Sequence, residues 1–282
     1  MRSVATVFMW LVTTLLLAVT LPVLWAQQNL VDRSGYTALT QRAATNPDLQ
    51  SAAAVELTTQ VGRLSAGADA AVVGRIAKMY TAGPSFPGQF AQANDFAHRW
   101  LFTDGVGSAL DAQGRWVIDF APLLSDAAFA QTLRDYNIAV PTSIPIPLTD
   151  NAPAGLRPGS LRVIGMWAPW VAWGLVALCA ASALLTLMAA HNRGKSLVGL
   201  GVSAVLVGAA GWAAIELAQR PLLTALDNTA GNIRTIADVM VATAESSMHQ
   251  WLNVTMTVGG GLVIVGVLVS LLAGLARHHS AR

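Results

Sequence analysis

The sequence predicts a mainly α fold: a four-transmembrane-helix bundle with a small α+β extracytoplasmic domain and a long extracytoplasmic amphipathic helix. Three observations favour this fold. Four long runs are apolar and nearly free of charge, two polar segments separate them unevenly, and the 15 acidic residues lie in or beside those polar segments. The chain is 54% hydrophobic and 11% charged, whereas soluble domains carry about 25% charged residues. We therefore expect a membrane protein.

The two central apolar runs, residues 163–190 and 196–217, are separated by a short basic sequence at 191–195. Each run is long enough to cross a hydrocarbon core of roughly 30 Å, which takes about 20 helical residues. Arg193 and Lys195 place the turn in the cytoplasm, because short cytoplasmic loops are enriched in Lys and Arg. The two runs therefore form a transmembrane hairpin that orients the rest of the chain.

The first apolar run, residues 4–25, follows Arg2. It is longer than the apolar part of a signal peptide, which has about 7 to 15 residues, and Leu24, Trp25 and Ala26 match a cleavage site poorly. We expect an uncleaved signal anchor with its N-terminus in the cytoplasm. A cleaved signal peptide is the alternative.

The fourth apolar run is followed by a basic C-terminal tail. Four crossings place both termini and the central turn on the cytoplasmic side of the plasma membrane, and the basic residues agree with this orientation. The predicted map is 1–26 signal-anchor helix, 27–161 extracytoplasmic α+β domain, 162–190 second span, 191–195 cytoplasmic turn, 196–217 third span, 218–253 extracytoplasmic amphipathic helix, 254–276 fourth span and 277–282 cytoplasmic tail.

Tryptophans lie near the run ends assigned to the outer face, with Trp173 about one turn deeper. The indole ring favours the headgroup level of a bilayer, so these residues are predicted membrane-interface anchors. In the alternative interpretation, three of them on the second span line a lipid site. The predicted anchors are Trp25, Trp167, Trp170, Trp212 and Trp251.

Small residues occur in the third and fourth spans where helices could approach closely, as at Ala204 and Gly208, and at residues 259–261. Such spacing predicts a compact bundle. Ionisable residues inside a membrane usually mark transport or proton relays. Only Glu216 comes close, and it lies at the outer end of its run, where we interpret it as an interfacial carboxylate.

The first polar segment contains helical and strand patterns. One helix is predicted to begin at Asp48, as its cap, and to end at residue 64, and three more are predicted over 70–80, 86–102 and 122–136. Two strands, at 106–110 and 116–120, are predicted to flank a turn. Residues 140–147 are predicted to form an edge strand or an extended arm. On the third of these helices, Asn94 and His98 share a face with aromatic residues.

The second polar segment is predicted to be one amphipathic helix. Its apolar positions include Leu226, Ile233 and Met240, and Gly231 is a candidate bend. The apolar face of so long a helix must pack against another surface. The alternatives are the first outer domain, a second copy of the chain in a coiled coil, and the membrane surface.

Four short sequences, LVDRSGY at 30–36, NPDLQ at 46–50, ANDFAH at 93–98 and VIDFAPL at 117–123, occur in this order after the first span. With the order of spans, they resemble a family of actinobacterial four-span integral membrane proteins that have an extracytoplasmic domain between the first and second spans. Asp95 stands where that family more often carries a basic residue. The resemblance implies the architecture and an envelope setting, and it implies no particular chemistry.

No zinc-helix, phosphate-loop, nucleophile-elbow or dinucleotide motif occurs, so no cofactor, metal or catalytic residue is assigned. The single cysteine, Cys179, lies in an apolar run, and the net charge of +2 has no basic cluster for nucleic acid. One catalytic interpretation pairs His98 with Asp119 or Asp95; in the other, Asn94 and His98 are satisfied polar residues. The candidate partner-binding or ligand-binding residues are Asn94, His98, Asp119, Leu226, Ile233 and Met240.

The leading functional hypothesis is a non-enzymatic multi-pass plasma-membrane protein that acts on the outer face as a scaffold or accessory subunit in cell-envelope assembly or transport. Its expected partners are membrane lipids and a protein of the membrane or envelope, with a homo-oligomer as an alternative. Two other hypotheses are a lipid-binding or lipid-transfer component, with a cavity beneath residues 222–251, and a membrane enzyme acting on envelope lipids.

Overall fold

A computed structural model describes residues 2–64, 69–103, 109–110, 116–119, 145–147, 158–190, 193–226 and 232–279. The chain divides into two compact units. The first, called here the membrane unit, contains Met1–Gln27, Trp167–Pro221 and Glu245–Arg282. The second unit contains Gln28–Met166 and Leu222–Ala244.

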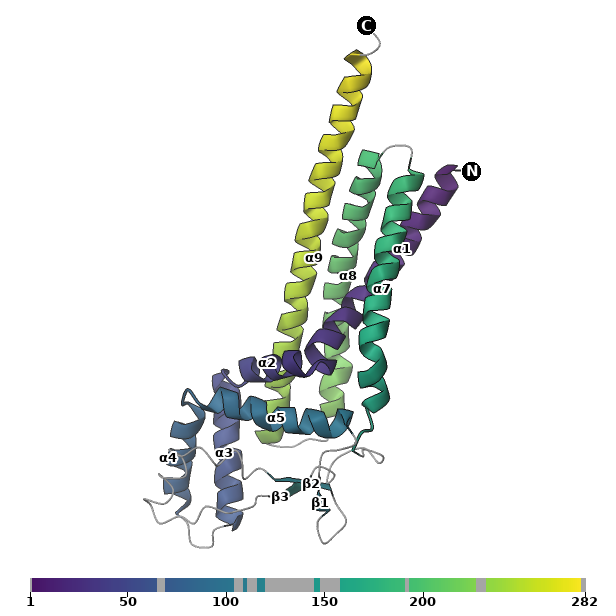
Figure 1. Ribbon diagram of the computed structural model, residues 1–282. Coiled ribbons are helices and arrows are strands. Elements are labelled where there is room, and N and C mark those ends of the chain that lie inside the picture. The colour runs from purple at the N-terminus through teal and green to yellow at the C-terminus, as the bar shows by residue number, and fades with distance from the viewer. Residues whose placement is uncertain are drawn as a thin grey trace. The chain divides into compact units, whose positions relative to one another are not determined.

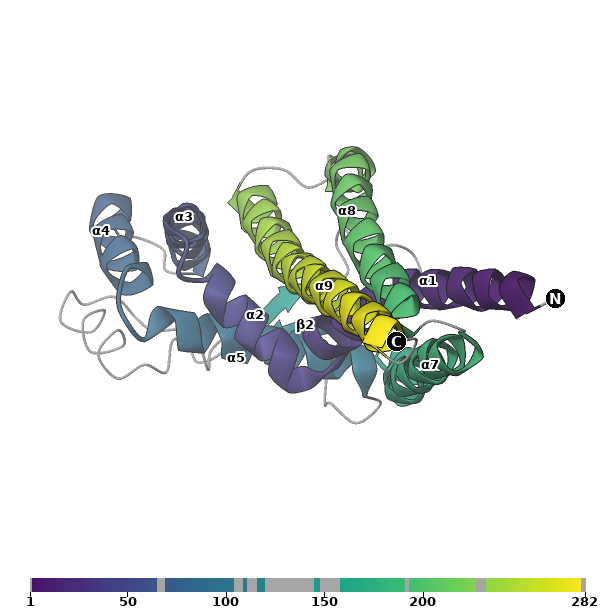
Figure 2. The ribbon, with the colours of Figure 1, turned by 90° about the horizontal axis from the view of Figure 1, so that it is seen from above.

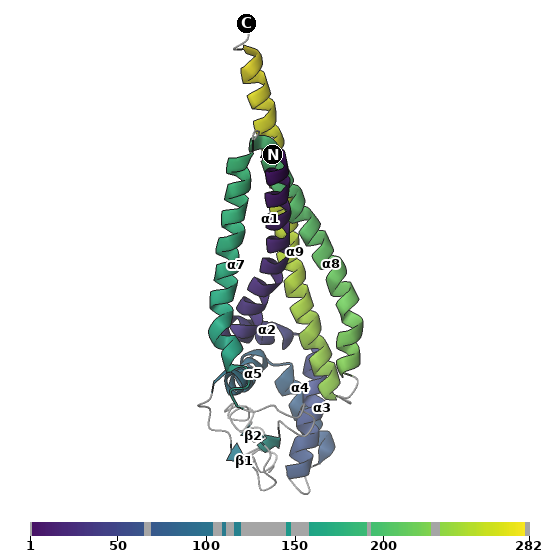
Figure 3. The same cartoon turned by 90° about the vertical axis from the view of Figure 1, so that its right-hand side faces the viewer.

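Four helices in the described residues are long and apolar enough to cross a membrane. They are α1 (Arg2–Ala26), α7 (Arg162–Ala189), α8 (Arg193–Leu226) and α9 (Asn232–His279). The axes of α7, α8 and α9 are roughly aligned, with the chain running through α8 in the direction opposite to α7 and α9, and α1 is inclined to them (Figures 1 and 3). The predictions of a mainly α fold and of a membrane protein with four apolar spans are confirmed.

The segment predicted as a separate amphipathic helix, residues 218–253, belongs instead to two of the long helices. Helix α8 continues past residue 217 to Leu226, and α9 already begins at Asn232. The apolar candidate span on α8 ends at Ala218, beside the predicted limit of residue 217. The helix continues beyond it because a change from apolar to mixed composition does not interrupt backbone hydrogen bonding. The candidate bend at Gly231 lies outside the described residues.

Helix α1 is followed by a π-helical turn, η1 (Gln27–Val31), and then by α2 (Arg33–Ala43), which the sequence did not predict. Asp32 is the N-cap of α2: its carboxylate accepts hydrogen bonds from the backbone N–H groups of Ser34, at 3.0 Å, and Gly35, at 3.1 Å. An N-cap of this kind satisfies donors that the first helical turn leaves unpaired. In the sequence, Asp32 is the residue that could have indicated the start of this helix.

Three further helices of the second unit agree with the predicted ones: α3 (Pro47–Leu64), α4 (Ala70–Thr81) and α5 (Phe86–Phe102). The predicted cap of α3, Asp48, was wrong. The capping side chain is that of Asn46, which accepts a 2.8 Å hydrogen bond from the backbone N–H of Asp48. Helices α3 and α4 lie side by side, as do α2 and α5 (Figures 1 and 2).

The core of the second unit covers part of the apolar face that was predicted for residues 218–253. The first turns of α9 contribute Val239 to a buried cluster with residues of α2, α3 and α5, and Ile236 and Met240 pack against it. This confirms the first of the three alternatives, a cover by the first polar domain, for these positions. Ile233, one turn earlier, remains 53% exposed.

Strands in the described residues are short: β1 (Ala109–Leu110), β2 (Trp116–Asp119) and β3 (Pro145–Pro147) form an antiparallel sheet in the order β1-β2-β3. Ala109 pairs with Val117, and Ile118 pairs with Ile146. The proline-containing β3 is at an edge, where missing N–H groups leave no gap in the sheet. The predicted helix 122–136 lies outside the described residues, and the α+β character of the domain stays a prediction.

Within the membrane unit, α8 and α9 approach through glycines. A Cβ atom added to Gly259 would lie 2.8 Å from the carbonyl oxygen of Gly201 and 2.9 Å from the Cβ of Ala204. Gly208 lies against Leu252 and Met256 of α9. The predicted packing at small residues, including Ala204 and Gly208, is therefore confirmed.

Helix α1 is joined to its neighbours by polar side chains. The hydroxyl of Thr13 lies 2.7 Å from that of Ser182 and 3.3 Å from that of Thr186, both on α7. The Trp10 indole donates a 2.9 Å hydrogen bond to the carbonyl of Gly199 on α8. Hydroxyl groups in an apolar bundle are costly unless paired, so these contacts fix α1 against both helices.

Candidate functional site

Two places in the structure are candidates for function, and each lies within one unit. The first is the α2–α5 cluster, which consists of Arg33, Tyr36, Asn94, Asp95 and His98. Residues from α2 and α5, about 60 positions apart in the chain, meet here. The second is an apolar groove in the membrane unit.

His98 is held in the α2–α5 cluster by one hydrogen bond and two rings. The side chain is 6% exposed, and its Nε2 lies 3.0 Å from the carbonyl oxygen of Leu30 in η1. A carbonyl can only accept, so Nε2 carries the hydrogen. The imidazole stacks on Phe102, with ring centroids 4.4 Å apart, and lies 4.8 Å from Tyr36.

Asp95 forms the charged part of the cluster. Arg33 donates from Nε to Oδ1 at 2.5 Å and from Nη2 to Oδ2 at 2.8 Å, and the Nε of Arg99 lies 3.3 Å from Oδ2. The hydrogen bonds from Arg33 hold the pKa of the Asp95 carboxyl below its usual range. The neighbouring Asp32 carboxyl also has a lowered pKa, chiefly because the Ser34 hydroxyl donates to it.

The described contacts of Asn94 and His98 are those of satisfied polar residues. Asn94 donates to the carbonyl of Phe90 at 2.9 Å and accepts from the Tyr36 hydroxyl at 3.4 Å. Asp95 is occupied by arginines, and no hydrogen bond joins it to His98 among the described contacts. The side chain of Asp119 lies outside the described part of the chain. The proposed acid–base pair therefore has no described geometry.

The other predicted partner-binding residues do not gather at the cluster. Met240 packs against the core of the second unit, and Ile233 is exposed. Leu226 ends α8, and its side chain is not described. Among described residues, no group of three or more His, Cys, Asp or Glu side chains could hold a metal ion.

The predicted anchors differ in their surroundings. Trp167 and Trp170 on α7 are 59% and 75% exposed, whereas Trp251 on α9 is half-buried. Trp25 donates to the Ser247 hydroxyl at 3.3 Å. A membrane-interface role for all five stays a prediction.

Trp212 has contacts that sequence reasoning missed. Its indole donates to the Asn253 side chain at 3.3 Å and stacks on His249 at a centroid distance of 3.8 Å. Both partners lie on α9, about 40 residues further along the chain. No local sequence pattern could have identified these tertiary partners.

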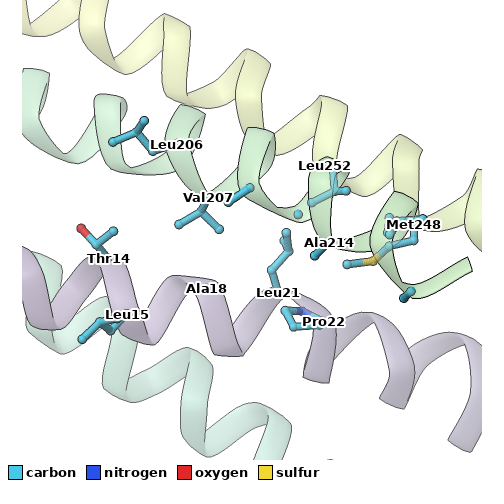
Figure 4. A pocket seen from close by; sticks show the side chains of 14 residues that line it. Thr14, Leu15, Ala18, Leu21, Pro22, Leu206, Val207, Ala214, Met248 and Leu252 are labelled. Carbon is cyan, nitrogen blue, oxygen red and sulfur yellow. The ribbon is translucent and has the colours of Figure 1, made fainter. Parts of the chain in front are cut away.

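The apolar groove lies between α1, α8 and α9 (Figure 4). It has a volume of about 610 Å³. Sequence reasoning placed a lipid cavity beneath residues 222–251, and the groove shares only Met248 with that segment. The signal that could have found it is the four-residue spacing of Ala210, Ala214 and Ala218, which places a row of small side chains on one face of α8.

Comparison of the chain with models of protein families, with curated proteins and with solved structures found no match. Functional inference therefore depends on the geometry of the two candidate sites and on the distribution of charge.

The lowered pKa of Asp95 predicts acid sensitivity of the contact between α2 and α5. A carboxyl whose pKa is depressed in the folded state adds stability at pH values above its unfolded pKa of about 3.9, and this stability is lost as the pH falls through the folded value. The lowered pKa of Asp32 likewise adds stability that is lost at acidic pH. We expect the protection factors of the α2 amides in the purified chain, which correct for the pH dependence of intrinsic exchange, to fall below about pH 4, as measured by hydrogen-exchange mass spectrometry.

The Asp95→Asn variant is the matched test of this acid sensitivity. It should exchange faster than wild type at neutral pH but change less on acidification, because one of the two depressed carboxyls is gone. Helix α4, whose cap Asp69 does not contact Asp95, provides the internal reference. Identical acid dependence of α2 in both proteins would show that Asp95 does not control it.

Proposed function

We propose that the chain is a non-enzymatic multi-pass plasma-membrane protein that acts on the outer face as a scaffold or accessory subunit in cell-envelope assembly or transport. The observation that carries the proposal is the separation of charge. No Asp, Glu, Lys, Arg or His occurs at 3–31, 163–189, 196–215 or 250–276. The charged residues of the α2–α5 cluster bind one another within the second unit. The spans thus provide an anchor and the second unit a folded surface.

The proposed orientation places both termini and residues 191–195 in the cytoplasm and the second unit outside. Arg2, Arg193, Lys195 and Arg277 support it through the positive-inside rule. The proposal includes a small α+β domain outside, of which the described helices and short strands are parts.

We propose the architecture and envelope setting of the actinobacterial four-span family for this chain, on the sequence resemblance alone. Two of the motifs that carry it, residues 30–36 and 93–98, contact one another: Arg33 pairs with Asp95, and His98 hydrogen-bonds to Leu30. The Arg33–Asp95 pair is particular to this chain, because the family more often carries a basic residue in place of Asp95.

A scaffold needs an accessible surface on the second unit, and α4 provides a position to test it. Met79 is 64% exposed, whereas Val73 on the same helix is 2% exposed. In a Cys179→Ser background, Met79→Cys should react in intact cells with a membrane-impermeant maleimide, and Val73→Cys should not. A bifunctional maleimide cross-linker at Met79→Cys should then yield a defined adduct with an envelope protein, identified by mass spectrometry.

Two outcomes of this experiment would contradict the proposal. Labelling of Met79→Cys only after the membrane is permeabilised would reverse the orientation. Labelling in intact cells without any protein adduct, at Met79→Cys and at Val55→Cys on α3, a residue that is 43% exposed, would contradict the scaffold role.

A further inference from the structure

The apolar groove of the membrane unit is lined by both large and small side chains, and the small ones lie mostly on α8. On α8 these are Ala210, Gly211, Ala214 and Ala218, and on α1 Ala18. In Figure 4, Leu21 of α1 and Leu252 of α9 bound the space opposite Ala214. The volume of about 610 Å³ is within the range of about 300–1,000 Å³ of pockets that hold small ligands. The space is partly open to the surroundings.

The lining residues all lie within the ranges of three candidate spans, Thr6–Val31, Arg193–Ala218 and Asn232–Leu272. A partly open groove at this level faces hydrocarbon when the chain is in a bilayer. The molecule that fills it is therefore drawn from the membrane, because an unfilled space forfeits the contacts of its lining atoms.

The groove offers no free polar group on its described side chains. Thr14 is its hydroxyl-bearing residue, and that hydroxyl donates to the carbonyl of Trp10 at 2.9 Å and lies 2.8 Å from the Ser203 hydroxyl. The remaining lining side chains are hydrocarbon or thioether. A headgroup would lose its hydration without gaining partners here, whereas a hydrocarbon chain would not.

The groove is elongated along α8. Its lining on α8 extends from Leu206 to Ala218, which at 1.5 Å per residue is about 18 Å. An extended hydrocarbon chain suits an apolar groove of this length.

We propose that this groove binds one acyl chain of a membrane phospholipid, which lies along α8 between α1 and α9. The phospholipid headgroup remains outside the groove, since no lining side chain is available to bind it. This site is independent of the scaffold function, because its residues belong to the membrane unit and none of them belongs to the α2–α5 cluster.

The proposal is tested by native mass spectrometry of the full chain, purified in mild detergent and incubated with mixed micelles of that detergent and phosphatidylglycerol. Wild type should retain one phospholipid per chain. Ala214→Trp fills the groove and should lower the lipid-bound fraction at least about tenfold, which corresponds to the loss of about 1.4 kcal/mol of binding free energy. Ala213→Trp adds the same side chain at the neighbouring exposed position outside the lining and should leave the bound fraction unchanged.

Circular dichroism and gel filtration establish that each variant is folded. If Ala214→Trp does not fold, Ala210→Leu, a smaller obstruction on the same wall, gives the decisive comparison. Equal phospholipid retention in wild type and the filled variant would overturn the proposal, as would the absence of bound lipid from wild type. Retention of a free fatty acid instead of a phospholipid would overturn it, and so would a wild-type dimer that the filled variant dissociates.

Discussion

Replacement of Gly259 by leucine is expected to separate α8 from α9 and to destabilise the membrane unit. A Cβ at this position would lie 2.8 Å from the carbonyl oxygen of Gly201 and 2.9 Å from the Cβ of Ala204. Backbone atoms and a Cβ cannot move aside by a rotamer change, so the two helices must part. Overpacking of this kind typically costs about 1–3 kcal/mol, and we expect the upper end or more because the obstacle is backbone.

The adjacent Gly260 provides a matched control for the Gly259→Leu variant. A Cβ added to Gly260 meets nothing within 4 Å. Gly260→Leu should therefore unfold near the wild-type temperature, while Gly259→Leu should unfold at a clearly lower one, measured by tryptophan fluorescence of the full chain in detergent. Equal unfolding temperatures for the two variants would show that the glycine contact between α8 and α9 does not support the bundle.

The Gly35→Ala variant should loosen the contact between η1 and α2. In a helix, alanine is normally more favourable than glycine by about 0.8–1.0 kcal/mol. At Gly35 the added Cβ would overlap the carbonyl oxygen of Gln28, so the sign of the effect is reversed. Separation of η1 from α2 also disturbs the hydrogen bond between His98 and Leu30. We expect a net destabilisation of about 1–3 kcal/mol.

Gly62→Ala in α3 is the control for Gly35→Ala, because its Cβ would enter open space. This variant should be as stable as wild type or more stable, by up to about 1 kcal/mol. Amide exchange measured by mass spectrometry locates the effect: Gly35→Ala should expose α2 and α5 and leave α4 protected. Unchanged protection of α2 in Gly35→Ala would rule out the close contact with Gln28.

The sequence predicted the spans and several helices of the second unit well, because these depend on local composition. The backbone N–H and C=O groups of the uncharged run that ends at Ala189 can all find hydrogen-bond partners in lipid only if the run is helical. The predicted helix 86–102 coincides with α5, since Pro87 favours its first turn and its apolar residues recur at helical spacing. Hydropathy and helix signals act over a few neighbouring residues, and both are visible in the chain itself.

Features that depend on distant residues could not be predicted in the same way. Helix α2 depends on the Asp32 cap and on packing against α5, and the pairing of Arg33 with Asp95 joins residues 62 positions apart. The continuation of α8 beyond its apolar span to Leu226 was not predicted, because a change in composition at residue 217 does not show where a helix ends. The groove is formed by three helices together and is therefore invisible in any one of them.

At the α2–α5 cluster, the sequence left two interpretations of Asn94 and His98 open. The described contacts are those of satisfied polar residues, since His98 hydrogen-bonds to the Leu30 carbonyl and Asn94 accepts from Tyr36. The alternative pairing of His98 with Asp95 or Asp119 has no described geometry. The π-helical turn that presents the Leu30 carbonyl has no sequence signature that separates it from the end of α1.

The polar contacts of α1 have a consequence for the order of assembly during synthesis. Thr13 meets Ser182 across 169 positions of sequence, an interval that translation at about 5–20 residues per second covers in roughly 8 to 34 s. Until then its hydroxyl can donate to the Met9 carbonyl of its own helix, at 2.8 Å. We expect α1 to enter the bilayer early without an unpaired group, and to dock last, after the helical hairpin partners have been made.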